Sequence, residues 1–140
     1  MNYILDTYAV SETIKPKPNT GFVSWLRAQD QDSLFISTVS LGEIRKGIER
    51  LPESKKKHDL QIWLLALIKE YKDHFLSFDE GCALSWGILS AQLELAGKMM
   101  SVLDVMIAAT ALSCGYCLVT RNESDYQHAG VQLLNPWTTS

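Results

Sequence analysis

The stretch from Ser101 to Asp125, SVLDVMIAATALSCGYCLVTRNESD, predicts a buried helix followed by a strand, and it decides the fold of the chain. Apolar side chains fall on more than one side of the helical part, about residues 103–113, which is typical of a helix packed between a sheet and another layer. A glycine ends this helix, and residues 117–119 form a short apolar run of strand type. Asp104 and Asp125 therefore stand near the two ends of a buried unit, where binding sites are usually built.

Other short apolar runs alternate with helical segments along the rest of the chain. The expected strands are centred near Ile4, Phe35, Leu76, Leu118 and Leu133. This alternation predicts an α/β fold, a three-layer α/β/α sandwich in which helices cover both faces of a mostly parallel sheet of about five strands. No repeat, linker or low-complexity segment interrupts the pattern, so we expect residues 1–140 to form a single domain.

Composition limits the class of protein. The 140 residues are 46% hydrophobic and 21% charged, as in a globular domain, and no uncharged apolar run reaches the ~18 residues that a membrane span requires. Asp6 directly follows the apolar N-terminal run, unlike in a signal peptide, and the three cysteines form no regular framework, so we expect a cytoplasmic protein with reduced thiols. A net charge of -3 argues against a protein that coats nucleic acid by bulk attraction, although a local basic patch is compatible with it.

Carboxylates occupy similar places relative to four of the expected elements. Asp6 ends the first strand, and Asp125 lies in the loop after the fourth. Glu43 and Asp104 fall in the first turns of two helices. Since parallel sheets bind ligands beyond the carboxyl ends of their strands, these side chains are candidates for one site. If they meet, mutual repulsion raises their pKa values unless a cation neutralises them, and an oxygen-only ligand set selects Mg²⁺ or Mn²⁺, which activates water for attack on a phosphodiester.

Each acid also has a purely structural interpretation. Ser40-x-x-Glu43 and Ser101-x-x-Asp104 both match the capping box, in which the acid satisfies backbone N–H groups of the first helical turn. Asp6 is alternatively a turn residue, and Asp125 an ordinary solvated loop residue. Local patterns alone leave the structural and the functional interpretations open.

A larger pattern runs through the same residues. In chain order it consists of Leu5-Asp-Thr7, Ser40-x-x-Glu43-Ile-Arg-x-Gly47, Asp104-x-x-Ile-Ala-Ala-Thr-Ala111 and Thr120-Arg-Asn-x-x-Asp125. This combination resembles the PIN-domain ribonucleases, specifically the VapC/FitB-type toxins of bacterial toxin–antitoxin pairs, over nearly the whole chain. The tail, Gly130-Val-x-Leu-Leu-Asn-Pro-Trp137, is similar to the FitB-like branch. Each motif alone is weakly specific, but all of them together at family spacing make a strong signal.

The resemblance implies a metal-dependent endoribonuclease, the toxin component of a type II toxin–antitoxin pair, which hydrolyses RNA with Mg²⁺ or Mn²⁺ as cofactor. The catalytic acids and metal ligands correspond to Asp6, Glu43, Asp104 and Asp125, and the supporting polar groups to Thr7, Thr120 and Asn122. The implied partners are a cognate antitoxin protein, the RNA substrate and a second copy of the chain in a homodimer. A larger complex with the antitoxin on operator DNA is also implied.

Tyr8 departs from the family pattern, which usually has Asn after Asp-Thr. A tyrosine does not replace the hydrogen bonds of a small amide, so a second hypothesis is a catalytically impaired PIN-fold module that binds antitoxin or RNA without cleavage. A phosphatase with Asp6 as nucleophile is disfavoured, because Tyr8 stands where a second acid would be expected. Tyr126, where Phe is common in the family, is a milder departure.

Further side chains indicate where partners bind. Basic residues flank the proposed acids and are candidates for contact with RNA phosphates: Arg45, Lys46, Lys98 and Arg121. The alternative for these residues is an ordinary solvated surface. Aromatic helix faces are candidates for the interface between two copies, on the helices that carry Phe22, Trp25 and Trp63.

Overall fold

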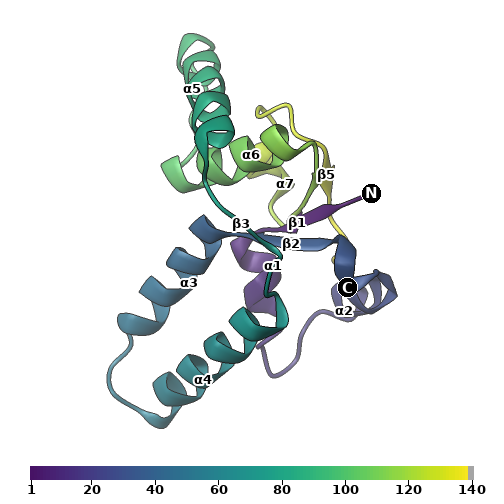
Figure 1. Cartoon of the computed structure of the whole chain (residues 1–140), viewed down its shortest axis with the longest axis vertical. Coiled ribbons are helices and arrows are strands. Elements are labelled where there is room, and N and C mark those ends of the chain that lie inside the picture. The colour runs from purple at the N-terminus through teal and green to yellow at the C-terminus, as the bar shows by residue number, and fades with distance from the viewer. Residues whose placement is uncertain (139–140) are drawn as a thin grey trace.

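Short apolar runs form the strands of a single sheet, which the computed structural model places between two layers of helices (Figure 1). The structure describes residues 1–138, so the last two residues of the expected domain lie outside the described part. The strands are β1 Tyr3–Leu5, β2 Leu34–Ser37, β3 Phe75–Leu76, β4 Cys117–Val119 and β5 Leu133–Leu134. They lie where the sequence predicts them, and their pairings are all parallel, so the predicted fold class is confirmed.

The strand order is β3-β2-β1-β4-β5, so β1 lies at the centre of the sheet. From β1 the chain proceeds outward through β2 to β3, and it then returns to the other side of β1 for β4 and β5. The direction of winding therefore reverses between β1 and β4, where open α/β sheets bind their ligands. Asp6 follows β1 and Thr120 follows β4 at this point, and the Asp6 N–H donates to the Val119 carbonyl over 3.1 Å.

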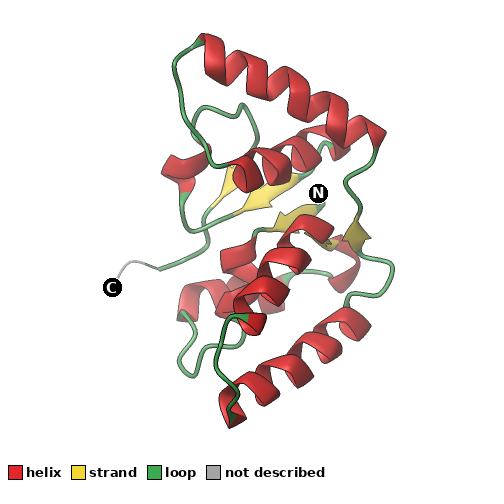
Figure 2. Cartoon of the chain, turned by 90° about the vertical axis from the view of Figure 1, so that its left-hand side faces the viewer, coloured by secondary structure: helices red, strands yellow, loops and turns green. Residues whose placement is uncertain are grey.

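Helices cover both faces of the sheet (Figure 1, Figure 2). On one face lie α1 Thr7–Glu12, α2 Thr20–Ala28, α3 Thr38–Glu49 and α4 Lys55–Glu70, and on the other face lie α5 Glu80–Leu95, α6 Val102–Cys114 and α7 Glu123–Tyr126. A short 3-10 helix, Gln31–Ser33, leads into β2. Across residues 1–138, no helix combines the length and the apolar character that crossing a membrane requires.

Alternation along the strands divides the core into two clusters, because successive side chains point to opposite faces. Leu5 and Val119 join the cluster beneath α1 to α4, whereas Ile4 and Leu118 join the cluster beneath α5 to α7. Helix α6 lies between the sheet and α5 and is buried on several sides, as predicted. Its buried residues are Val105, Ile107, Ala108, Ala109, Thr110 and Ala111.

Side-chain caps determine where most helices begin. The capping residues accept hydrogen bonds from N–H groups of the first turn and are Asp6, Asn19, Ser37, Ser54, Asp79 and Ser101. The expected cap at Ser101 is therefore present, and its Oγ accepts the Asp104 N–H over 3.2 Å. The expected capping box at Ser40-x-x-Glu43 is wrong, because Ser37 caps α3 and Ser40 is already inside the helix.

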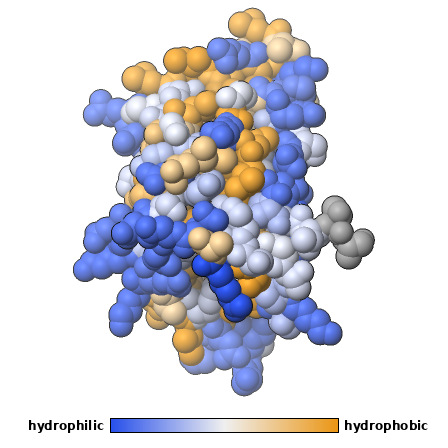
Figure 3. Space-filling view, turned by 90° about the vertical axis from the view of Figure 1, so that its right-hand side faces the viewer, coloured by the Kyte–Doolittle hydropathy of each residue, from blue (hydrophilic) through white to orange (hydrophobic). Residues whose placement is uncertain are grey.

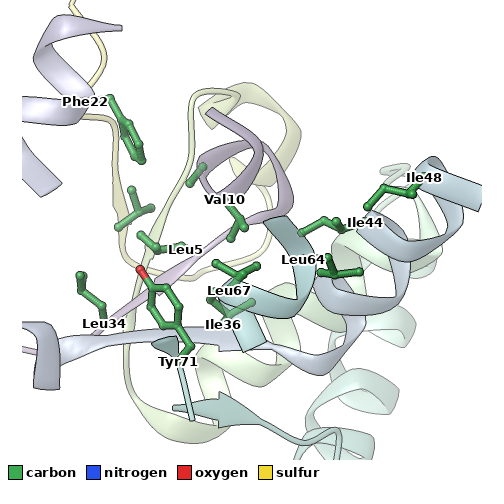
Figure 4. Close-up of a cluster of buried hydrophobic side chains, with 12 residues drawn as sticks. Leu5, Val10, Phe22, Leu34, Ile36, Ile44, Ile48, Leu64, Leu67 and Tyr71 are labelled. Carbon is green, nitrogen blue, oxygen red and sulfur yellow. The ribbon is translucent and has the colours of Figure 1, made fainter. Parts of the chain in front are cut away.

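Phe22, on α2, points into the core and not toward the surface. Its side chain is fully buried (Figure 4) and stacks on Trp137, with ring centroids 4.4 Å apart. Trp25 and Trp63 are partly buried and pack against the same cluster. The Phe22 ring therefore packs within its own chain, whereas the interface expected on the helices that carry Phe22, Trp25 and Trp63 stays a prediction.

Replacement of Phe22 by alanine should lower the free energy of unfolding by about 3–5 kcal/mol, because it removes a buried ring and leaves a cavity beside Trp137. Urea unfolding followed by circular dichroism measures the difference. Ile62 on α4 is 54% exposed, so Ile62→Ala is a matched control that should change the unfolding free energy by less than about 0.5 kcal/mol. Equal effects of the two substitutions would contradict the assignment of Phe22 to the core.

Candidate active site

A cavity of about 520 Å³ opens beside the carboxyl end of β1. Its walls consist of Asp6, Thr7, Tyr8, Ser11, Glu43, Ser101, Asp104, Asp125 and Tyr126. These side chains come from the junction of β1 with α1, from α3, and from the regions of α6 and α7. The structure therefore brings together all of the acids that the sequence singles out, although each comes from a different element.

Glu43 reaches the cavity from the second turn of α3. The sequence had placed it in the first turn, so that expectation is corrected. Because α3 begins at Thr38, the carboxylate of Glu43 is too far along the helix to cap it. Thr7 Oγ1 donates to Glu43 Oε1 over 2.7 Å and lies 3.0 Å from Ser40 Oγ. Thr7 thus joins the start of α1 to α3 and holds the Glu43 carboxylate at the cavity wall.

Asp104 lies in the first turn of α6, and its backbone and side chain have different partners. Its N–H donates to the cap at Ser101, whereas its carboxylate Oδ1 accepts a hydrogen bond from the Tyr126 hydroxyl over 3.1 Å. Tyr126 is 3% exposed, and this burial, with the nearby Asp6 and Asp104 carboxylates, raises the pKa of its hydroxyl. Tyr126 therefore stays protonated and donates. Ser101 therefore caps α6, whereas the Asp104 carboxylate bonds the Tyr126 hydroxyl and not a backbone N–H in the described part of the chain, so the interpretation of Asp104 as a capping acid is not supported.

Asp125 lies in α7, a single helical turn after β4, and not in an open loop as the sequence suggested. The buried Oγ1 of Thr120 accepts the Asn122 N–H over 3.0 Å, and the Asn122 carbonyl accepts the Asp125 N–H, also over 3.0 Å. Thr120 and Asn122, expected as supporting residues, do not line the cavity. They shape the turn that carries Asp125.

Asp6 is the most deeply buried of these acids, with 1% of its surface exposed. Its Oδ1 accepts the Ala9 N–H over 2.8 Å, whereas Oδ2 is buried without a hydrogen bond of normal geometry within residues 1–138. Burial raises the pKa of Asp6 to about 6, although the nearby Thr120 hydroxyl and the Ala9 N–H lower it in part. The Asp104 carboxylate adds to the rise, and the Arg121 guanidinium opposes it.

The oxygen donors of this cavity suit a hard divalent cation. Carboxylates and hydroxyl groups make up its described walls and neither His nor Cys contributes to them, which favours Mg²⁺ or Mn²⁺ over zinc. The Oδ2 of Asp6 is the clearest sign, because a buried carboxylate oxygen needs a hydrogen-bond donor or a cation. In the described part of the chain, no three Asp, Glu, His or Cys side chains stand close enough together to enclose a metal ion. The oxygen donors are therefore of the chemical type that Mg²⁺ prefers, but their side chains are not positioned to coordinate one ion together.

A family model described as PIN domain matches residues 3–131. The chain belongs to the PIN-domain family. Plasmid stability protein StbB of Pseudomonas syringae pv. tomato is 33% identical over 135 residues, which cover 96% of this chain and 97% of the relative. VapC ribonuclease Y4jK of Sinorhizobium fredii is 32% identical, with 96% of each chain covered, and toxin FitB of Neisseria gonorrhoeae is 30% identical, with 96% and 97% covered. The resemblance to VapC/FitB toxins is thereby confirmed.

The PIN domain also matches solved structures of toxin–antitoxin complexes. FitAcB from Neisseria gonorrhoeae has a TM-score of 0.91 and 30% identity, over 98% of this chain and 99% of that chain. FitAB bound to an IR36 DNA fragment has a TM-score of 0.90 and 29% identity, over 99% and 97%. The α/β/α arrangement is therefore shared over nearly the full length of both chains.

Four residues of the PIN-domain cavity have no site role in the sequence-based prediction, namely Tyr8, Ser11, Ser101 and Tyr126. Ser11 lines the cavity one helical turn after Thr7, so the i, i+4 spacing on α1 was a usable signal. Tyr126 supports Asp104 from 22 positions away in the chain, and no local pattern indicates such a contact. Long-range support of this kind becomes visible only in the folded structure.

In metal-free buffer, Asp6→Asn should stabilise the PIN domain at neutral pH by about 2–3 kcal/mol, because the buried carboxylate destabilises the fold when it ionises. The folded protein binds the Asp6 proton more tightly than the unfolded chain, whose pKa is near 3.8. The contribution of Asp6 to stability therefore falls as pH rises from about 4 to above 6, and the advantage of the variant grows over that range. Urea unfolding of both proteins in EDTA, at pH values across this range, measures the difference in unfolding free energy. An advantage independent of pH would contradict the raised pKa.

Proposed function

We propose that this PIN-domain protein is a metal-dependent endoribonuclease and the toxin of a type II toxin–antitoxin pair. The observation that carries the proposal is the convergence of Asp6, Glu43, Asp104 and Asp125 on one cavity at the place where the sheet reverses direction. The Sinorhizobium relative is named a ribonuclease and the Neisseria relative a toxin, which supports the same activity here.

We propose that these acids hold Mg²⁺ or Mn²⁺ during turnover. When bound, such a cation supplies an activated water and stabilises the charge that develops on the phosphodiester. Asp6 contributes the buried oxygen that lacks a partner. Thr7 holds the Glu43 carboxylate and Tyr126 holds that of Asp104, and these neutral hydroxyls orient the acids without cancelling their charge.

The alternative is a module that binds RNA or antitoxin without cleavage because Tyr8 replaces the usual Asn. Cleavage is supported by the position of Tyr8, which is 53% exposed at the cavity wall. The hydrogen bonds to Glu43 and Asp104 come from Thr7 and Tyr126 instead. The supports of the acids therefore do not depend on the side chain at position 8.

We propose that a cognate antitoxin binds across the cavity and an apolar groove beside it. The groove is lined by Thr7, Ser11, Ile14, Glu43, Ile44, Gly47, Ile48, Leu51, Leu60 and Trp63, and the first two of these and Glu43 also line the cavity. An antitoxin segment that fills the groove with apolar side chains would bring an Arg or Lys against the acids. FitAB bound to a DNA fragment and VapBC2 of Rickettsia felis bound to a promoter fragment support a larger complex on operator DNA.

We propose that a second copy of the chain covers the apolar surface of α5 and the start of α6. Large apolar side chains are exposed there, namely Leu84, Trp86, Ile88, Leu95, Met99 and Val102. Figure 3 shows hydrophobic residues gathered at the end of the molecule that α5 forms. Because exposed apolar surface of this kind is typical of interfaces, this face is a further candidate for self-association beside α2 and α4.

Ile88 on α5 is 63% exposed, and Ile88→Glu should convert a dimer into a monomer, because the interface would bury an unpaired charge. Sedimentation velocity at micromolar concentration measures the mass. Ile62→Glu on α4, which is 54% exposed, is the matched control and should leave the mass unchanged. A wild-type protein that sediments as a monomer would rule out the proposed homodimer.

The purified protein should cleave RNA in Mg²⁺ or Mn²⁺, and Asp104→Asn should reduce the rate by at least about 100-fold, because a carboxylate that holds the cation is lost. Gel electrophoresis of labelled RNA measures the rate. Glu123→Gln is a matched control, since Glu123 is an exposed acid on α7 outside the cavity wall. Equal rates for wild type and Asp104→Asn would refute the proposal.

Calorimetric titration with Mg²⁺ or Mn²⁺ separates the enzyme from the non-catalytic module without reference to activity. Wild-type protein should bind the cation and gain thermal stability, because the cation binds the folded state and not the unfolded chain. Asp6→Asn should bind more weakly, because it lacks the unpartnered oxygen. A wild-type protein that binds neither cation cannot use the proposed chemistry.

A further inference from the structure

Tyr8 is an exposed aromatic side chain at the wall of the acid-lined cavity. It is 53% exposed and belongs to neither hydrophobic cluster, so core packing does not require an aromatic residue here. It follows Asp6 and Thr7 at the start of α1 and lines the cavity with them. A ring that the core does not use, beside a proposed site of phosphodiester cleavage, is available to a ligand.

Arg121 lies over the ring of Tyr8, with its guanidinium carbon Cζ 5.4 Å from the ring centroid. This cation–π contact joins the turn after β4 to the start of α1 and restrains both side chains. Arg121 is exposed, and among the residues that the structure describes it makes no ion pair. Its charge also lowers the pKa of Asp6, so a positive charge acts at the edge of the cavity.

A ring and a guanidinium in this arrangement match the chemistry of one nucleotide. A base offers a flat face that stacks on an aromatic ring, and the phosphate offers the anion that a guanidinium binds. A small free anion is a poorer match, because it leaves the aromatic ring unused. A paired base in a duplex does not match either, because its neighbours cover both of its faces.

The surface on the other side of the acids could accommodate the rest of a single-stranded RNA. A second cavity, of about 570 Å³, shares Ser101, Asp104 and Asp125 with the first and is also lined by Lys98. Arg121 beside Tyr8 and Lys98 beyond the shared residues therefore flank the acidic centre. A polyanionic strand along this path meets a cation before and after the acids.

We propose that Tyr8 and Arg121 form a nucleotide-binding subsite, in which one unpaired RNA base stacks on the Tyr8 ring and Arg121 binds an adjacent phosphate. The inference rests on the proposed function, which supplies RNA as the substrate. It adds the requirement that the RNA presents an unpaired base next to the cleaved bond. Tyr8 is then a residue that selects the substrate and not a defect in the acidic site.

Binding is measured apart from cleavage, with the Asp104→Asn variant as background, an end-labelled single-stranded RNA and fluorescence anisotropy in metal-free buffer. Adding Tyr8→Ala should weaken binding roughly 10-fold or more, whereas Tyr8→Phe keeps the ring and should bind within about 2-fold of the background. Arg121→Gln should weaken binding and reduce the salt dependence by about one phosphate contact. Arg27→Gln, an exposed arginine on α2, is the control and should change neither quantity.

An abasic scan identifies the stacked base. RNAs that lack one base at a time should show one position of weakened binding when Tyr8 is present, and no such position with Tyr8→Ala. Equal RNA affinities with and without Tyr8→Ala, or identical abasic profiles, would overturn the subsite.

A duplex that binds as tightly as the single strand would also overturn the subsite. A Tyr8→Ala protein that loses only antitoxin binding would overturn it as well. Circular dichroism of Tyr8→Ala should match the background, because Tyr8 is outside the core.

The outcomes separate this inference from the proposed function. A wild-type protein that fails to cleave RNA but shows a Tyr8-dependent abasic position retains the subsite and loses the nuclease. A protein that cleaves RNA in Mg²⁺ or Mn²⁺ but shows no Tyr8-dependent position retains the nuclease and loses the subsite.

Discussion

The carboxylate of Asp6 is buried at the end of the central strand, and the site is arranged around its two oxygens. Oδ1 caps α1 through the Ala9 N–H and so directs the chain as it leaves β1. Oδ2 is buried near the Thr120 hydroxyl and has no hydrogen bond of normal geometry within residues 1–138. A buried oxygen of this kind costs stability, and the proposed cation would offset that cost. The other acids stand around this buried charge, at the place where the sheet reverses direction.

Neutral hydroxyl groups hold two of the surrounding acids without neutralising them. Thr7 donates to Glu43, and Tyr126 donates to Asp104. A Lys or Arg in either place would form an ion pair and cancel the negative charge that the proposed cation would need. Burial keeps the Tyr126 hydroxyl protonated, so it remains a donor beside the carboxylates. The cavity therefore combines fixed geometry with retained negative charge, while Arg121 supplies positive charge only at its edge.

Local patterns predicted the strands and the buried helix α6, because local chemistry determines them. Ser101 was recognisable as a cap, and it begins the expected helix α6. Errors arose where two local interpretations compete. Ser37 and Ser40 are both suitable caps for α3, and the end of β2 selects the first. The segment that carries Asp125 spans four helical residues, which is too short to show a helical period.

The sequence by itself determined the order of strands and helices, the class of fold and the places of the acids near element ends, because these depend on residues close together in the chain. Only the tertiary structure decided that the acids share a cavity, that Tyr126 supports Asp104 and that Arg121 lies over Tyr8. Each of these contacts joins segments that are distant in the chain. Their positions follow from the strand order β3-β2-β1-β4-β5 and from the helices packed on it, which local patterns do not encode.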